Sequence, residues 1–483
     1  MTATIADLWQ SLRNKYLWLA LVIFLALLRL CHLNLLWADE DYHIAAALNL
    51  LHGKLPYRDF WYDKPPLCAV YYLLIGSFAG LPLRLLDAAY VLCSSWLAYE
   101  LARTWWSEAE ARTASLLLAF SLAFYLPSTI IPFAADALMI VPHLAAIYCA
   151  RLNRPLLAGV WGAVAFLFNA KGVFVLGVCV LWLLPEWWLV VIGFALPVVA
   201  GLMTAFFTGT WAGYYEQVWH WSVIYAEQSP VSNPFALGLR RTADWLGFQG
   251  ALTAGAIYGL FRFTRDERWK FGVWIVLSFI PVCLGTRFVP RYFLQLLPPM
   301  AVVAARGITV ALHQFRKTAV VVLASLLLVP LIRFGPRYIS LTIDDIRGDE
   351  PHWTDIALDL DSRRVATHLN GIKISGDTLF VWGYRPDIYV YTRLVSDGRF
   401  WDSQPLTGVP ADRHLKVAKA IYGGPAAANR QELARSHPTF IIDGLSLLNP
   451  ALAPAAYPEL HPWLAHYRLI GKTDLSLIYR RLD

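Results

Sequence analysis

The sequence predicts a polytopic α-helical membrane protein that ends in a smaller soluble α/β domain. The chain has 483 residues, of which 58% are hydrophobic and 16% are charged, whereas a soluble protein carries about 25% charged residues. The apolar residues gather in runs of about 16–22, the length that membrane helices need. These runs stop near residue 335, and the roughly 145 residues that follow are enough for one small domain. We therefore predict a membrane domain over 1–335 and a second domain over 336–483.

The basic residues predict which side of the membrane each loop faces. Arg13 and Lys15 precede the first apolar run, so the N-terminus is predicted to be cytoplasmic. The ambiguous run is Pro65–Pro82, which is short and begins with two prolines. If it lies at the interface as a re-entrant or juxtamembrane helix, the later basic loops all face the cytoplasm, whereas a crossing would reverse them. We therefore predict an outer loop over 39–82 that contains juxtamembrane helices.

With that choice the sequence predicts about eleven membrane spans, within a range of roughly 11–13. They are Leu17–Trp37, Leu83–Thr104, Ala111–Leu126, Ala135–Ala150, Leu156–Asn169, Gly172–Leu184, Trp187–Phe207, Gly247–Phe263, Phe271–Leu284, Tyr292–Ala311 and Thr318–Ile332. An odd number of spans places the C-terminal domain on the extracytoplasmic side, which is the periplasm if the chain lies in a bacterial inner membrane. The net charge of +7 is explained by the short basic loops, so no nucleic-acid partner is expected.

The C-terminal domain is predicted to alternate helices and short strands, as a small α/β layer does. The predicted helices are Asp355–Asn370, Ala411–Ile421 and Arg430–Ser436, and the predicted strands are Thr378–Trp382, Thr439–Asp443 and an edge strand over Ser476–Arg480. The domain contains neither a GxGxxG nor a Walker motif, so nothing in it indicates a nucleotide.

Asp39, Glu40 and Asp41 form the densest acidic group near the membrane. Carboxylates at this depth are costly to desolvate unless they are paired or functional. Two functions suit them: a general base toward an acceptor hydroxyl, or ligands of a divalent cation held by Asp39 and Glu40. The alternative is a solvated helix N-terminus, where acidic residues are also favoured.

Three further charged residues lie at the ends of apolar runs on the predicted outer face. Asp136 opens the span Ala135–Ala150 and is either a helix N-cap or part of a site. Lys64, in the motif Asp63-Lys64-Pro65-Pro66, and Lys171 are candidates for binding a phosphate at headgroup depth. Ordinary snorkelling of the two lysines is the alternative interpretation.

Two more groups lie on the same predicted face. Arg287, Arg291 and Tyr292 are placed at an outer helix mouth, where the positive-inside rule disfavours arginine and an anionic partner is therefore attractive. The predicted loop Thr210–Asn233 is rich in aromatic residues, which form an interfacial belt or else stack on sugars and cover a site. Its candidate substrate contacts are Trp219, His220 and Tyr225.

Carboxylates and cations at headgroup depth suit a lipid-phosphate substrate with a hydroxyl acceptor, and a sugar phosphate is one such substrate. The order of the motifs adds a resemblance. The relevant pieces are Asp39-Glu40, Gly53-x-x-Pro56-Tyr57, Lys64-Pro65-Pro66-Leu67, Arg84-Leu85, Asp136-Ala137-Leu138, Lys171-Gly172, Pro290-Arg291-Tyr292 with Pro298-Pro299, Leu379–Gly383 and Pro386–Tyr389. Together they resemble the GT-C class of membrane glycosyltransferases, in the branch of the protein O-mannosyltransferases and the lipid A aminoarabinose transferase.

This resemblance implies an enzyme that moves a sugar from a polyprenyl-phosphate donor to a hydroxyl or phosphate, usually with inversion, on the outer side of the membrane. It implies that Asp39 is the base, with Glu40 and Asp136 beside the acceptor. It also implies that Lys64 and Tyr292 contact the donor phosphate. One departure is Asp63, because the lipid A branch has Glu there and the mannosyltransferases have His-Pro-Pro, so a lipid, a glycan and a protein acceptor all stay open. The alternative function is a non-enzymatic transporter or flippase of lipid-linked sugars.

Overall fold

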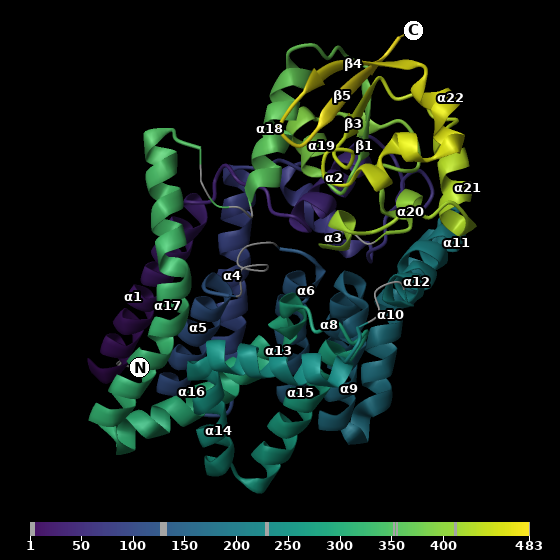
Figure 1. Cartoon of the computed structure of the whole chain (residues 1–483). Coiled ribbons are helices and arrows are strands. Elements are labelled where there is room, and N and C mark those ends of the chain that lie inside the picture. The colour runs from purple at the N-terminus through teal and green to yellow at the C-terminus, as the bar shows by residue number, and fades with distance from the viewer. Residues whose placement is uncertain are drawn as a thin grey trace. The chain divides into compact units, whose positions relative to one another are not determined.

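The computed structural model describes residues 5–125, 133–227, 231–350, 353, 356–409 and 413–482. The chain forms two compact units, each assembled from three separate segments (Figure 1). The first, which we call the helical unit, consists of Met1–Asn34, Gly80–Ala200 and Val231–Pro351. The second, which we call the mixed unit, consists of Leu35–Ala79, Gly201–Pro230 and His352–Asp483. The predicted outer loop thus clusters with the C-terminal segment. The predicted division at residue 335 lies inside a helix, and the assignment of membrane and extracytoplasmic domains stays a prediction.

Most helices of the helical unit follow the predicted apolar runs, although Pro234–Phe248 was not predicted and the residues of Trp187–Phe207 after Ala200 belong to the mixed unit. The helices are α1 (Ile5–Leu30), α4 (Leu81–Arg103), α5 (Glu108–Ala123), α6 (Ala135–Leu138), α7 (Ile140–Arg151), α8 (Pro155–Phe168), α9 (Val173–Trp182), α10 (Trp187–Phe207), α13 (Pro234–Phe248), α14 (Gly250–Arg262), α15 (Arg265–Cys283), α16 (Leu297–Gln314) and α17 (Arg316–Arg347). Within the described residues, three stretches are long and apolar enough to cross a membrane, namely Leu184–Phe207, Pro290–Gln314 and Arg316–Arg347. The count of about eleven spans therefore stays a prediction.

Several predicted spans differ from the observed helices. Leu17–Trp37 was expected to be helical throughout, but α1 ends at Leu30. The span Ala135–Ala150 is divided at Met139 into α6 and α7. Within Pro65–Pro82 the structure has only the six-residue α3 (Leu67–Tyr72) and the three-residue 3₁₀ helix η1 (Leu73–Ile75). These are too short to cross a bilayer at 1.5 Å per residue, and the position of this segment at the membrane surface stays a prediction.

Helices α14 and α16 approach each other through glycines, as membrane helices often do. A Cβ atom on Gly307 would lie 1.9 Å from the carbonyl oxygen of Gly255 and 2.6 Å from the backbone nitrogen of Gly259. Such a contact is sterically forbidden, so these backbones can pack at this distance only because side chains are absent.

We expect Gly307→Ala to destabilise the protein by about 3 kcal/mol or more, because the new methyl group forces two backbones apart. Gly272→Ala is the matched control, since a Cβ on this α15 glycine would meet nothing within 4 Å. The control should gain about 0.5–1 kcal/mol from helix propensity. Thermal unfolding of the two purified variants in detergent compares them, and equal melting temperatures would contradict the close packing.

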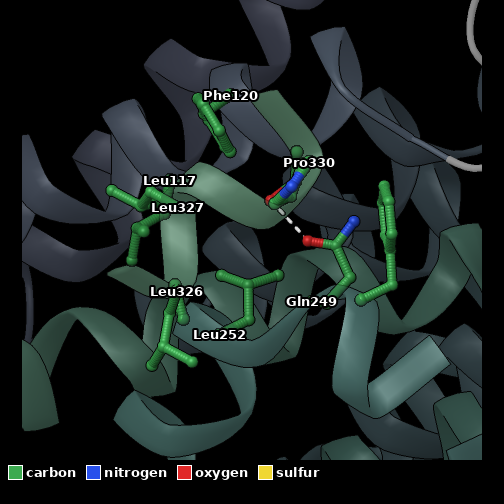
Figure 2. A pocket seen from close by; sticks show the side chains of 10 residues that line it. Leu117, Phe120, Gln249, Leu252, Leu326, Leu327 and Pro330 are labelled. Atoms are coloured by element: carbon green, nitrogen blue, oxygen red, sulfur yellow. Dashed lines mark hydrogen bonds between the residues drawn. The ribbon is translucent and has the colours of Figure 1, made fainter. Parts of the chain in front are cut away.

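A small pocket lies between α5, α17 and the α13–α14 junction (Figure 2). It is lined by Leu117, Phe120, Ser121, Phe248, Gln249, Ala251, Leu252, Leu326, Leu327 and Pro330. Ser121 Oγ donates to the side-chain carbonyl of Gln249 at 3.2 Å, and this is the interaction drawn in Figure 2. The pocket wall is otherwise apolar, and none of the predicted site residues lines it.

The mixed unit contains a five-stranded sheet in the order β2-β1-β3-β5-β4. Its strands are β1 (Thr378–Trp382), β2 (Val395–Ser396), β3 (Phe440–Asp443), β4 (Tyr467–Lys472) and β5 (Leu477–Arg481). Strand β1 pairs in parallel with β2 and β3, while β5 pairs antiparallel with β3 and β4. All four residues of β3 are buried, as expected for a continuous apolar run in a central strand. The predicted strand Thr378–Trp382 is confirmed at both ends.

The helices of the mixed unit come from all three of its segments. They are α2 (Glu40–Leu51), α3, α11 (Trp211–Tyr214), the π-helix η5 (Tyr215–His220), α12 (Trp221–Glu227), α18 (Ala357–Asn370), α19 (Asp387–Thr392), α20 (Gln404–Thr407), α21 (Gly424–Leu433) and α22 (His461–Leu464).

Three predictions in this unit were wrong. The aromatic segment Thr210–Asn233 was expected to be a loop, but it is helical from Trp211 to Glu227. The expected edge strand near the C-terminus is β5, which lies between β3 and β4, because the missed strand β4 covers its outer side. The expected helix Ala411–Ile421 is reduced to the 3₁₀ turn η8 (Arg413–Lys416), while residues 411 and 412 lie outside the described residues.

Candidate functional site

The three acids at positions 39–41, at the start of α2, have three different environments. Glu40 is fully buried, and one of its carboxylate oxygens accepts a hydrogen bond from the Trp37 backbone N–H at 3.1 Å. Asp41 is buried and turns toward the interior of the mixed unit. Asp39 is half-buried at the N-cap position of α2.

Asp39 has an unusual backbone conformation. Its φ is 79° and its ψ is −40°, a strained combination for a residue with a side chain. Its side chain makes no capping hydrogen bond to the helix, while Glu40 and Asp41 lie in the first turn of α2, where acidic residues are favoured. A non-glycine residue held in a sparsely populated region costs about 1–3 kcal/mol and is found mostly at functional sites.

Asp41, in contrast to Asp39, is enclosed by other parts of the mixed unit. Its side-chain oxygen accepts from the Tyr42 backbone N–H at 2.7 Å, and α2 packs against α19. Burial raises the pKa of Asp41 well above its ordinary value, and the negative charges of Asp387 and Glu40 raise it further. Burial likewise raises the pKa of Asp387 to about 7. Asp41 is therefore a buried acid whose described hydrogen bond goes to the α2 backbone.

These acids do not present a good divalent-cation site. Glu40 accepts from the Trp37 N–H, and both Glu40 and Asp41 are buried, whereas Asp39 is only half-buried. Among the described residues, no group of three or more His, Cys, Asp or Glu side chains is arranged to hold a metal ion. The donor set does not favour a cation shared by Asp39 and Glu40, so no step below is routed through one.

Lys64 lies in the loop that joins α2 to α3, also within the mixed unit. Its ammonium nitrogen is 2.7 Å from an Asp63 carboxylate oxygen, and its side chain is 37% exposed. The Tyr57 hydroxyl donates to the Lys64 carbonyl at 2.8 Å. The lysine head is thus directed by its neighbouring acid and still reaches solvent, as a phosphate-binding lysine must.

The helical unit brings together three of the predicted residues that are far apart in sequence. Lys171 Nζ lies 3.0 Å from Asp136 Oδ1 and 3.5 Å from the centre of the Tyr292 ring. Asp136 comes from α6, Lys171 from the 3₁₀ turn η3 (Ala170–Gly172) and Tyr292 from the 3₁₀ helix η6 (Pro290–Leu296). The lysine is therefore held by an ion pair on one side and a cation–π contact on the other.

Asn169 completes this group and was missed by the sequence analysis. Its side-chain nitrogen donates to Asp136 Oδ1 at 3.0 Å, and its side-chain oxygen accepts from the Lys171 backbone N–H at 3.1 Å. It has an extended backbone between α8 and η3. The backbone of Asn169 separates α8 from η3, and its amide side chain contacts both Asp136 and the Lys171 backbone. An uncharged residue at the end of an apolar run carries no signal that sequence reasoning could have used.

Arg287 and Arg291 are both half-buried. Arg287 lies in a turn with unusual backbone conformations, and Arg291 lies on the helix η6 that follows it. Thr286 and Phe288 both have positive φ, at 56° and 46°. The Phe288 ring fills the space beside Gly238 of α13, where a Cβ would lie 2.5 Å from the ring. The packing of this ring holds the strained turn that presents Arg287.

The aromatic segment contributes a residue that the sequence analysis overlooked. Trp219 is 39% exposed and His220 is exposed, whereas the side chain of Tyr225 lies outside the described residues. Gln217, in the same π-helix, is fully buried. Its side-chain oxygen accepts from the Tyr62 N–H and its nitrogen donates to the Tyr57 carbonyl, both at 2.7 Å. The segment therefore supports the Lys64 loop through this glutamine, and π-helices are often found at functional sites.

Asp402 is a further buried acid in the mixed unit. It is 1% exposed, and its Oδ1 accepts from the Gln404 N–H at 2.8 Å. Burial raises the pKa of Asp402 to about 7; the negative charge of Asp63 adds to this shift and the positive charge of Lys64 opposes it. The acid is therefore electrostatically linked to the Lys64 loop.

Asp402 predicts a pH dependence of stability. Because its folded pKa exceeds the unfolded value of 3.8, the folded protein binds more protons than the unfolded chain between these two values. The free energy of unfolding should therefore fall as pH rises from about 4 to about 7, by an amount of the order of 4 kcal/mol. Asp402→Asn should make the slope of melting temperature against pH shallower. Asp474→Asn, at a side chain that is 79% exposed, should leave the slope unchanged, and equal slopes in all three proteins would contradict the assignment.

Comparison with known proteins gives a match in fold. No protein-family model matches the chain, and no curated protein matches it. The apo structure of ArnT from Cupriavidus metallidurans matches with a TM-score of 0.63 at 13% identity, covering 97% of this chain and 98% of ArnT. The same protein bound to undecaprenyl phosphate matches with a TM-score of 0.61 at 13% identity, over 96% and 97% of the two chains.

A second protein matches over most of this chain. Archaeal oligosaccharyltransferase AglB from Archaeoglobus fulgidus, in complex with an inhibitory peptide and a dolichol-phosphate, has a TM-score of 0.51 at 13% identity, over 94% of this chain and 72% of AglB. The chain therefore shares the GT-C membrane fold of ArnT and AglB, the class that its motifs resemble.

Proposed function

We propose that this chain is an integral-membrane glycosyltransferase. It moves a sugar from a polyprenyl-phosphate donor to a hydroxyl or phosphate acceptor on the extracytoplasmic face of the inner or plasma membrane, with inversion at the anomeric carbon. The observation that carries the proposal is the environment of Asp39. Of the three adjacent acids, Asp39 is half-exposed on a strained backbone, whereas Glu40 and Asp41 are buried in other interactions.

The fold match supports the choice of donor. The ArnT structure that matches over 96% of this chain was obtained with undecaprenyl phosphate, and the AglB structure contains a dolichol-phosphate. Both ligands are polyprenyl phosphates, so a lipid phosphate is the natural donor class for the same fold. The AglB structure also contains an inhibitory peptide, and for this chain lipid, glycan and protein acceptors are all kept in the proposal.

In this mechanism Asp39 accepts the proton of the acceptor hydroxyl as that oxygen attacks the anomeric carbon. The new glycosidic bond forms on the face opposite the phosphate, while the bond between the sugar and the phosphate oxygen breaks. The lipid phosphate leaves with the bonding electron pair, and the ammonium group of Lys64 stabilises its added charge. A phosphate is a good leaving group, so no protonating acid is required.

The second group of residues has a separate role in this proposal. Asp136, held by Lys171 and Asn169 within the helical unit, is the candidate hydrogen-bond acceptor for the substrate that receives the sugar. Arg291 and Tyr292 both lie on the short helix η6 and contact the donor phosphate in this proposal, together with Arg287 on the preceding turn. Trp219 and His220 supply exposed ring surface for a sugar.

The direct test is to incubate the purified protein in detergent with a radiolabelled undecaprenyl-phosphate sugar and a lipid or glycan acceptor extract. Transfer releases free undecaprenyl phosphate and moves the label to the acceptor fraction. A flippase of lipid-linked sugars would leave the sugar–phosphate bond intact and would instead move the intact donor across a vesicle bilayer. Intact donor with every sugar and acceptor tested, together with movement across the bilayer, would replace the transferase with the transporter.

A further inference from the structure

The loop that carries Lys64 is held by three different parts of the mixed unit. The Trp61 N–H donates to the Arg399 carbonyl at 2.7 Å. The Tyr62 N–H donates to Gln217 at 2.7 Å, and the Asp63 N–H donates to the Tyr42 hydroxyl at 3.3 Å. Three successive backbone N–H groups thus have three partners from distant segments. Such a loop has little conformational freedom as long as every partner is in place.

The C-terminal segment contacts Trp61 of this loop in more than one way. Besides accepting from the Trp61 N–H through Arg399, it donates to the Trp61 carbonyl through the indole N–H of Trp401, at 2.5 Å. The peptide groups on both sides of Trp61 are therefore bonded to a segment more than 300 residues away in sequence. The guanidinium of Arg399 also lies 5.4 Å from the centre of the Trp61 ring.

The same segment contacts the helix that begins beside Asp39. The Trp401 ring stacks on the Tyr42 ring of α2, with centroids 4.8 Å apart and an interplanar angle of 24°. The Tyr389 hydroxyl of α19 donates to the Trp401 carbonyl at 2.9 Å, which holds the backbone of Trp401 against the C-terminal segment. Trp401 therefore bridges α2 and the Lys64 loop and is itself held by the C-terminal segment.

We propose that Trp401 and Arg399 are positioning residues that hold the Lys64 loop in the conformation that binds the donor phosphate. The inference rests on the proposed function, in which Lys64 contacts that phosphate. It assigns a role to the C-terminal segment: residues 399–402 complete the donor side of the site.

The test replaces single tryptophans in the full-length protein. Trp401→Phe removes the indole N–H and keeps a ring that can stack on Tyr42. Trp463→Phe is the matched control, because Trp463 is also buried and its indole N–H donates to a backbone carbonyl, that of Ser436, at 2.8 Å. The two variants therefore lose the same kind of hydrogen bond, but only Trp401→Phe loses one to the Lys64 loop.

Two measurements separate the loop conformation from the proposed chemistry. The first is hydrogen exchange of the peptide covering residues 58–66, which should rise roughly 2- to 10-fold in Trp401→Phe and stay at the wild-type rate in Trp463→Phe. The second is the affinity for undecaprenyl phosphate, which should weaken roughly 2- to 10-fold in Trp401→Phe only. Should Trp401→Phe fail to fold, Arg399→Met serves in its place, since it removes the contact with the Trp61 ring at a side chain that is 22% exposed.

The outcomes have distinct meanings. If exchange in the loop is unchanged, or if the control changes equally, residues 399–402 do not position the loop and the inference is wrong. If exchange rises while phosphate binding is unchanged, Lys64→Ala decides between two conclusions. Weakened binding in Lys64→Ala would leave the phosphate role of Lys64 intact and overturn the positioning role. Unchanged binding in Lys64→Ala would overturn the proposed role of Lys64 in the transferase.

Discussion

Asp39→Asn is expected to lower sugar transfer about 10²- to 10⁴-fold, the usual contribution of a general base. An amide cannot accept the proton of the acceptor hydroxyl, although it has almost the same shape as the carboxylate. Asparagine also tolerates positive φ better than most residues, so the backbone at φ 79° should be kept. The variant should therefore fold, insert and melt like the wild type while losing turnover in the labelled-donor assay.

Asp41→Asn is the matched control for this variant. It changes a neighbouring acid in the same way, but Asp41 is buried and accepts from the Tyr42 backbone N–H, a hydrogen bond that the side-chain oxygen of asparagine can also accept. We expect this control to retain transfer within a few-fold of the wild type. Wild-type turnover in Asp39→Asn would remove Asp39 from the mechanism, and equal losses in both variants would attribute the effect to α2 as a whole.

Lys171→Met is expected to cost about 3–5 kcal/mol of stability, because it leaves the charge of Asp136 without its cation in a poorly solvated place. The side chains of this pair are only 17% and 11% exposed, with their charged atoms 3.0 Å apart. Asn169 still donates to Asp136 in the variant, but one neutral amide does not balance a buried carboxylate. Thermal unfolding of the detergent-solubilised protein measures the loss.

The double variant Asp136→Asn/Lys171→Met separates structure from function at this pair. Removing both charges should restore most of the lost stability, since no unpaired charge is left. If Asp136 accepts a hydrogen bond from the acceptor substrate as proposed, transfer should stay low in the restored protein, whereas donor binding changes little. A stable double variant with wild-type transfer would show that the ion pair only holds α6 and η3 together.

Much of the local structure could be predicted because it depends on short runs of residues. The span Trp187–Phe207 agrees with α10 at both ends, since an uninterrupted apolar run has few alternatives to a helix. Strand β1 is likewise marked by continuous burial. The aromatic segment from Trp211 to Glu227 was misjudged as a loop, because aromatic residues favour strands and interfaces and say little about helix formation.

The candidate site was predicted in pieces. Asp39, Asp136 and Lys171 could each be identified because a charged residue beside an apolar run requires an explanation. Their partners could not, because the partners come from distant parts of the chain. Lys171 was expected to bind a phosphate, and the structure pairs it with Asp136 and Tyr292, residues from two other elements.

Gln217 and Trp401 could not be identified from the sequence either. Both are ordinary polar or aromatic residues in sequences that already contain many such residues. They matter because their side chains reach Tyr62 and Trp61, whose backbone groups would otherwise be buried without partners.

By itself, the sequence determined that the chain is rich in apolar runs, that a smaller α/β region follows them, and which charged residues stand at their ends. These properties depend on composition and on near neighbours. Only the tertiary structure decided which of the adjacent acids stays partly exposed, that Lys171 pairs with Asp136, and that Arg399 and Trp401 contact Trp61 in the loop before Pro65. Those properties depend on burial and hydrogen bonding between segments hundreds of residues apart, and one sequence carries no local signal of such contacts.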